Sequence, residues 1–172
     1  MQKDNLPLVS IVTLTWNTTD ITCDFLRSIN EHCTYNNLEI IIVDNGSKDD
    51  PTGVFKSIRP DVKVILNGKN LGFTGGNNVG IKVATGDFLF IVNNDTEVTA
   101  DLIEKLLKPF ETDKQIAVVC PKIKYYDNPD YIQFAGFAKM NMYTGRTHSI
   151  GDKEKDDGRY DEERCGRCKK TI

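Results

Sequence analysis

Residues 38–47 read Leu38-Glu39-Ile40-Ile41-Ile42-Val43-Asp44-Asn45-Gly46-Ser47, a short apolar run that ends in polar residues. A nearly continuous run of β-branched residues is typical of a strand buried on both faces of a parallel sheet. The four residues after Val43, Asp44-Asn45-Gly46-Ser47, are typical of a turn, because Asp and Asn side chains form hydrogen bonds to nearby backbone and glycine adopts positive φ. This stretch therefore predicts a buried strand whose carboxyl end opens into a turn.

Further apolar runs of the same kind lie on both sides of this one. Each is short and rich in Val, Ile or Phe, so each is interpreted as a strand of the same sheet. The predicted strands are 8–14, 38–43, 62–66, 88–92 and 116–120.

Helical patterns separate the apolar runs. Apolar residues four apart predict amphipathic helices over 19–31 and around Leu102, Leu106 and Phe110. Pro51 suits the first turn of a short helix, and another is expected over 77–84. The alternation predicts an α/β fold with a mostly parallel sheet flanked by helices. A small β-hairpin towards the C-terminus, formed by 122–126 and 131–139, is expected around the turn at 128–130.

The composition is that of a globular protein of 172 residues, with 39% hydrophobic and 27% charged residues. A net charge of −3 argues against a nucleic-acid partner, because such partners need a basic surface. The N-terminus lacks the features of a secretory signal, and no transmembrane segment of about 20 apolar residues is found. We expect a cytoplasmic protein; peripheral membrane association and oligomeric state stay open.

The composition changes near the C-terminus. Residues 151–172 contain seven acids and seven bases but almost no apolar residues, so we expect a charged, mobile tail after a domain of residues 1–150. The five cysteines are scattered, which is typical of free thiols. Cys165 and Cys168 form a C-x-x-C pair without further ligands for zinc, and we interpret them as two exposed thiols of that tail.

Polar residues follow four of the predicted strands, where ligands bind to parallel α/β sheets. The glycine- and asparagine-rich segment 70–78 favours close approach to a phosphorylated ligand, although neither a P-loop nor a G-x-G-x-x-G pattern is present. Asp95 is a candidate ligand for Mg²⁺ or Mn²⁺, if phosphate oxygens and water complete its coordination. The four polar segments are Thr15-Trp16-Asn17, Asp44-Asn45-Gly46-Ser47, 67–78 and Asn93-Asn94-Asp95-Thr96.

Taken together, these segments resemble the family 2 glycosyltransferases with the GT-A fold, most closely their rhamnosyltransferase-like members. The resemblance spans about residues 7–140 and rests on four motifs in the family's order and spacing. The motifs are residues 9–17, residues 42–47, Asn70-Leu71-Gly72-Phe73 with Gly76-Asn77, and residues 93–96.

The resemblance implies a site for a nucleotide-sugar donor. Asp44 would accept a hydrogen bond from the ring N–H of uracil or thymine, and Asp95 would bind the metal. Asn93 stands where the family has the first Asp of its D-x-D motif, which leaves one protein carboxylate for the ion. The other implied substrate-binding residues are Thr15, Trp16 and Asn17 beside the base, Asn70, Gly72 and Asn77 along the ribose and diphosphate, and Asn94.

The implied reaction is transfer of a sugar, with inversion, from a dTDP- or UDP-sugar to a hydroxyl of a saccharide or lipid-linked acceptor, as in polysaccharide biosynthesis. In the family, the general base lies far beyond the metal-binding carboxylate, and no such motif follows Asp95 here. We therefore expect a chain truncated after its donor-binding half, with the catalytic base absent. Two alternatives stay open: a nucleotide-sugar-binding domain without transferase activity, and a nucleotidyltransferase.

Overall fold

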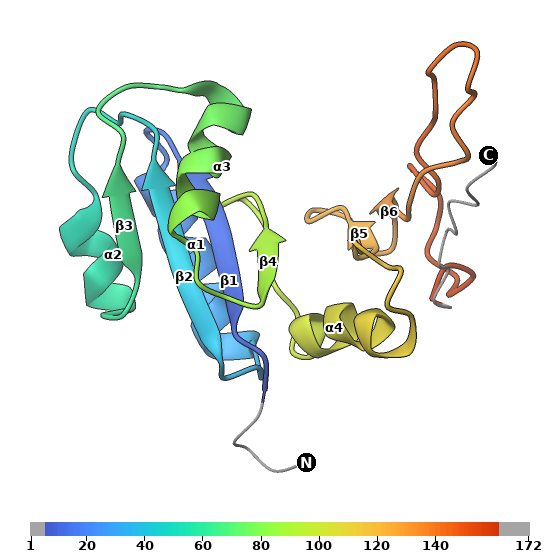
Figure 1. Ribbon diagram of the computed structural model, residues 1–172, viewed down its shortest axis with the longest axis horizontal. Helices are drawn as coiled ribbons and strands as arrows, with labels where there is room; N and C mark the ends of the chain where they lie inside the picture. The colour runs from blue at the N-terminus through green and yellow to red at the C-terminus, as the bar shows by residue number, and fades with distance from the viewer. Residues whose placement is uncertain (1–5, 162–172) are drawn as a thin grey trace. The chain divides into compact units, whose positions relative to one another are not determined.

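The computed structural model describes residues 6–161. The chain divides into two compact units, Met1–Asp101 and Leu102–Ile172. The first unit contains a parallel sheet and three helices, and the second contains one helix and a small antiparallel hairpin (Figure 1). This is the α/β architecture with a C-terminal hairpin that the sequence predicts.

The sheet of the first unit has the strand order β3-β2-β1-β4, and every pair in it is parallel. Four of the five predicted strands are confirmed. The prediction of a fifth strand at 116–120 is wrong, because these residues pair with no other segment of the described chain. An apolar run is compatible with a strand, but a strand forms only where its backbone makes hydrogen bonds to a neighbouring strand. The strands are β1 (Val9–Thr15), β2 (Leu38–Asp44), β3 (Lys63–Leu66) and β4 (Phe88–Ile91).

Helices cover both faces of this sheet: α3 crosses the front face in Figure 1, and α1 lies behind it. The predicted helices are all present, although α3 begins five residues before the predicted start at Asn77. Glycines lower helix propensity, so the sequence alone predicts a loop before Asn77. The bounds are α1 (Thr19–His32), α2 (Thr52–Ile58), α3 (Gly72–Val83) and, in the second unit, α4 (Leu102–Thr112).

Glycines in α3 let the helix approach the sheet closely. A Cβ on Gly80 would lie 2.5 Å from Cγ1 of Val12 and 3.1 Å from Cγ2 of Val43. A Cβ on Gly76 would lie 2.9 Å from Cδ2 of Leu14, at the end of β1. Tertiary packing therefore explains these two glycines, and it brings the start of α3 beside the carboxyl end of β1.

A buried carboxylate joins the opposite, amino-terminal end of the sheet. Glu39 of β2 accepts hydrogen bonds from Ser10 Oγ at 2.5 Å and from the Thr85 N–H at 2.8 Å, and it forms an ion pair with Lys63. Burial opposes its ionisation, but the bonds from Lys63, Ser10 and Thr85 prevail and hold the pKa of Glu39 at about 2. This one side chain ties β1, β2, β3 and the loop before β4 together.

In the second unit, β5 (Ile123–Lys124) and β6 (Ile132–Phe134) form the predicted antiparallel hairpin. The stretch predicted as a tail is described as far as Asp161, and it is bonded to β6: Ile132 N–H donates to the Glu154 carbonyl at 2.9 Å, and Lys153 N–H to the Ile132 carbonyl at 2.8 Å. The predicted boundary at residue 150 stays a prediction. Cys165 and Cys168 lie outside the described residues.

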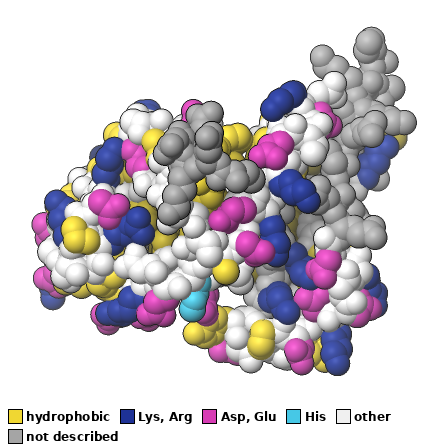
Figure 2. Space-filling model, turned by 90° about the horizontal axis from the view of Figure 1, so that it is seen from below, with side chains coloured by type: hydrophobic (Ala, Val, Ile, Leu, Met, Phe, Trp, Pro, Cys, Tyr) yellow, Lys and Arg dark blue, Asp and Glu magenta, His cyan; other side chains and the backbone are white. Residues whose placement is uncertain are grey.

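The described surface carries charges of both signs. On the face that Figure 2 shows, Lys and Arg side chains lie among Asp and Glu side chains. Among residues 6–161, no helix has both the length and the apolar character needed to cross a membrane.

Candidate functional site

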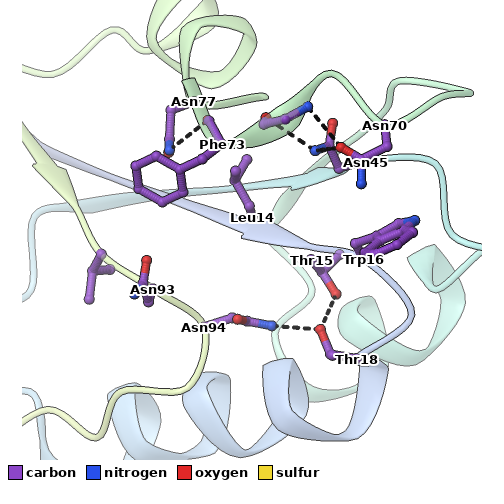
Figure 3. Close-up of a pocket in the computed structure, with 12 residues that line it drawn as sticks. Leu14, Thr15, Trp16, Thr18, Asn45, Asn70, Phe73, Asn77, Asn93 and Asn94 are labelled. Carbon is purple, nitrogen blue, oxygen red and sulfur yellow. Dashed lines mark hydrogen bonds between the residues drawn. The ribbon is translucent and has the colours of Figure 1, made fainter. Parts of the chain in front are cut away.

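A pocket of about 330 Å³ lies at the carboxyl ends of β1 and β4, beside the start of α3 (Figure 3). Ligands of parallel α/β sheets bind at this edge. The strand order is β3-β2-β1-β4, and the loops after all four strands contribute residues to the pocket. The pocket is lined by Leu14, Thr15, Trp16, Thr18, Asn45, Asn70, Gly72, Phe73, Asn77, Val92, Asn93 and Asn94.

One wall of the pocket is the loop before α3, which the buried side chain of Asn45 holds in place. Its amide nitrogen donates to Asn70 Oδ1 at 2.9 Å and to the Gly72 carbonyl at 3.2 Å. Its amide oxygen accepts from the Leu71 N–H at 3.0 Å and from Asn67 Nδ2 at 3.1 Å. All four bonds reach the same loop, so a single side chain at the end of β2 fixes its course.

The first turn of α3 completes this wall. Gly72 has a φ of +70°, and its N–H donates to Asn70 Oδ1 at 2.7 Å. Asn77 is buried and donates to the Phe73 carbonyl at 3.0 Å, while the Phe73 ring lies over the pocket in Figure 3 and is 65% exposed. An exposed ring in a pocket wall offers a surface on which a flat ligand group can pack.

The opposite wall is the turn after β4, which a cluster of threonine hydroxyls anchors. Asn94 Nδ2 donates to Thr18 Oγ1 at 2.9 Å and to Thr22 Oγ1 at 2.8 Å. Thr22 Oγ1 donates in turn to Thr15 Oγ1 at 3.0 Å, at the end of β1. The side chain of Asn94 thus holds the turn against the start of α1. Asn93 and Asp95, its neighbours in the sequence, lie on the same turn.

The turn after β2 is closed by the Asp44 carboxylate. It accepts hydrogen bonds from the N–H groups of Gly46 and Ser47, at 3.2 and 3.0 Å, and from the Ser47 hydroxyl. Asn17 joins this turn to the end of β1: its N–H donates to Ser47 Oγ at 2.8 Å, and its Oδ1 accepts from the Lys48 N–H at 2.9 Å. Asp44 is buried, and because a carboxylate has about four acceptor positions, roughly one is not used within the turn.

The Asp95 side chain is exposed, and it makes no hydrogen bond or ion pair with the rest of residues 6–161. It directly follows Asn93 and Asn94, which line the pocket. Mg²⁺ is commonly held by one or two carboxylates together with phosphate oxygens and water. An exposed, unengaged carboxylate that directly follows two lining residues in the sequence fits such an ion. Within the described part of the chain, no three His, Cys, Asp or Glu side chains cluster to form a cage made of protein alone.

Seven of the ten predicted site residues line the pocket, and three do not. Asn17 and Asp44 shape the adjoining turn, and Asp95 follows two lining residues in the sequence. Thr18, Asn45 and Phe73 were not among the predicted site residues, although Asn45 and Phe73 belong to the quoted motifs. The seven are Thr15, Trp16, Asn70, Gly72, Asn77, Asn93 and Asn94.

The sequence matches the model of the family described as Glycosyl transferase family 2 over residues 10–166. The match covers most of the chain and all four polar segments. The protein belongs to glycosyl transferase family 2.

Curated relatives agree with this assignment. The chain is 31% identical to the glycosyltransferase GlyG of Streptococcus pneumoniae over 72% of its own length and 41% of GlyG. It is 29% identical, over 74% of its length and 49% of the relative, to WfaP of Escherichia coli, which is named a UDP-Glc:alpha-D-GlcNAc-diphosphoundecaprenol beta-1,3-glucosyltransferase. The chain spans 29% to 42% of the length of the first five curated relatives it matches.

Solved structures show the same fold. The mannosyltransferase PcManGT from Pyrobaculum calidifontis, described in complex with GDP-Man and Mn²⁺, matches with a TM-score of 0.55 and 22% identity, over 70% of this chain and 35% of that protein. TarS of S. aureus, as the 1-349 form, matches with a TM-score of 0.54 and 22% identity, over 61% of this chain and 32% of that one.

Proposed function

We propose that the pocket binds the nucleoside diphosphate of a dTDP- or UDP-sugar, and that the chain is the donor-binding part of a metal-assisted, inverting glycosyltransferase. The observation that carries the proposal is the chemistry of the lining. In a member of a sugar-transferring family, the loops after four neighbouring strands supply amide, hydroxyl and aromatic groups to one pocket. These are the groups that a ribose, a diphosphate and a flat base require.

The lining contains no Lys or Arg. A diphosphate is strongly anionic, and an anion in a pocket without a positive partner loses hydration that amide groups only partly replace. The start of α3 supplies part of the missing positive potential, because the dipole of a helix favours an anion at its N-terminus. The remainder is proposed to come from Mg²⁺ or Mn²⁺ beside the phosphates, with Asp95 as its protein ligand. When bound, such an ion stabilises the charge that develops on the departing nucleoside diphosphate.

Residues on the two sides of the pocket take different parts in this proposal. Trp16 is exposed at the rim and offers a surface for the base, whose ring N–H would use the remaining acceptor position of Asp44. Asn70, with Asn77 and the Gly72 backbone, would bond to ribose and phosphate oxygens. Asn93 would bond to a sugar or ribose hydroxyl; it lies on the turn that Asn94 anchors.

Transfer also needs a general base for the acceptor hydroxyl. Among the lining residues, none carries a carboxylate, imidazole, amine or phenol that could accept this proton. We therefore assign donor binding, and not the complete transfer, to residues 6–161. The lack of such a base among the lining residues also favours a second candidate function, a nucleotide-sugar-binding domain that does not catalyse transfer.

Calorimetric titration tests the proposal. UDP, dTDP and GDP, and then UDP-glucose and dTDP-rhamnose, are titrated into the chain with Mn²⁺ and again with a chelator. We expect a uracil or thymine nucleotide to bind in the presence of Mn²⁺ and to lose about tenfold or more in affinity without it. If no nucleotide binds, both hypotheses are refuted: the donor-binding part of a glycosyltransferase and the nucleotide-sugar-binding domain without transferase activity.

A further inference from the structure

The second unit carries a hairpin arm, residues 131–155, that extends from β6. Its two sides are joined by backbone hydrogen bonds: Ala135 N–H donates to the Ile150 carbonyl at 2.8 Å, Ala138 N–H to the His148 carbonyl at 2.9 Å, and Asn141 N–H to the Arg146 carbonyl at 2.8 Å. Asn141 Oδ1 also accepts N–H bonds at the tip, from the two residues that follow Met142. The arm therefore has defined backbone geometry up to its tip.

Large apolar side chains of the arm are exposed to solvent. Phe137 is 63% exposed, Met140 51%, Met142 82% and Tyr143 101%. Two of the three methionines of the whole chain lie at this tip. Single exposed apolar residues need no explanation, but four on one hairpin make it a candidate interaction surface.

The charge of the part of the arm from 131 to 151 indicates which partner this surface suits. The 21 residues from Tyr131 to Gly151 contain no Asp or Glu, in a chain with 25 acids and a net charge of −3. Lys139 and Arg146 give the tip a positive charge, and the acids resume immediately afterwards at Asp152. A basic tip with adjacent apolar side chains complements an anionic lipid surface, where bases meet phosphate groups and apolar groups enter the acyl boundary.

We propose that the tip of the arm, residues 137–146, docks the protein on an anionic membrane surface. Met140, Met142 and Tyr143 enter the interface, and Tyr143 keeps its hydroxyl at the level of the headgroups. Lys139 and Arg146 contact lipid phosphates. A flexible methionine adapts to irregular lipid packing better than a branched side chain, which suits it to this position. The proposal does not depend on nucleotide binding.

The test is co-sedimentation of the full chain with vesicles in the absence of nucleotide. Vesicles of phosphatidylglycerol mixed with phosphatidylcholine are compared with phosphatidylcholine alone. We expect binding to the anionic vesicles only, and weaker binding when salt rises from about 0.1 M to about 0.5 M, because salt screens charges at the surface. Equal binding to both vesicle types, or no binding to either, would overturn the proposal.

Matched variants locate the contact. Met142→Ser with Tyr143→Ser should weaken vesicle binding about tenfold, whereas Tyr126→Ser, which removes a 77% exposed tyrosine outside the arm, should leave it unchanged. Lys139→Gln with Arg146→Gln should remove the preference for anionic lipid. The control is Lys56→Gln with Lys82→Gln, which makes the same charge change at exposed positions of α2 and α3. This control should keep the preference for anionic lipid.

A second copy of the chain is the competing partner for the same surface. Analytical ultracentrifugation without lipid distinguishes it: we expect the wild-type chain and the Met142→Ser/Tyr143→Ser variant to sediment alike. A dimer that this variant dissociates would assign the tip to self-association and overturn membrane docking. Circular dichroism of each variant checks that the fold is retained.

Discussion

The side chain of Asn45, at the end of β2, donates to Asn70 Oδ1 at 2.9 Å and thereby joins the sheet to the loop that leads into α3. Asn70 Oδ1 also accepts the Gly72 N–H at 2.7 Å, so the first turn of α3 is positioned through the same pair. The wall of the pocket thus depends on one buried amide, and its geometry is set before any ligand binds.

Asn45→Ala should destabilise the fold and impair the pocket together. The variant removes four hydrogen bonds. Because the net contribution of one hydrogen bond to stability is about 0.5–1.5 kcal/mol, we expect the free energy of unfolding to fall by about 2–4 kcal/mol. Urea denaturation measures it. Asn78→Ala, at an exposed position of α3, is the matched control and should change stability by about 0.5 kcal/mol or less.

Asp95→Ala should abolish the Mn²⁺-dependent part of nucleotide binding and leave stability nearly unchanged, because the side chain is exposed and unengaged. Calorimetry with and without Mn²⁺ gives the binding difference, and thermal unfolding gives the stability. Glu31→Ala, which removes an exposed acid from the last turn of α1, is the charge-matched control. If Asp95→Ala keeps the full Mn²⁺ effect, the carboxylate is not the metal ligand.

Asp44→Ala should weaken uridine or thymidine diphosphate binding by about 1.5–3 kcal/mol, the range for a lost hydrogen bond to a charged group. It also removes three bonds from the turn after β2, so stability must be measured alongside binding. Ser47→Ala separates the two effects, since it loosens the turn but keeps the carboxylate. Equal losses of affinity in both variants would indicate a structural role for Asp44.

Replacement of Glu39 should change how stability depends on pH. The pKa of Glu39 is held at about 2, below the ordinary value of 4.5, so the ionised carboxylate stabilises the folded state above pH 4.5. This stabilisation is lost as pH falls from about 4.5 to about 2, and the shift corresponds to about 3 kcal/mol. Urea unfolding at several pH values should show that decline in the wild type and a smaller one in Glu39→Gln. An identical decline in both proteins would contradict this account.

Two glycine substitutions in helices should have opposite effects. Gly80→Ala places a Cβ against Val12 and Val43 under α3, and overpacking of this kind costs about 1–3 kcal/mol. Gly53→Ala in α2 meets nothing within 4 Å, so the higher helix propensity of alanine should leave stability unchanged or raise it by up to about 1 kcal/mol. Thermal unfolding compares them, and a neutral Gly80→Ala would argue against the close packing of α3.

The sequence alone determined the fold class, because periodicity and turn chemistry are local properties. The apolar run at 38–43 specified β2, and the polar residues after it marked the edge of the sheet where the pocket lies. For the same reason, residues at other strand ends, such as Thr15 and Asn93, could be assigned to one site before any geometry was known.

Only the tertiary structure decided which side chains build the pocket and which hold it. Asn45 is an ordinary turn residue by sequence, and its role arises because the end of β2 lies beside the loop before α3, more than twenty residues later in the chain. The early part of α3 likewise packs closely on the sheet, where Gly76 lies against Leu14, and this packing outweighs the low helix propensity of its glycines. Contacts between segments distant in sequence leave no local pattern, so periodicity could not reveal them.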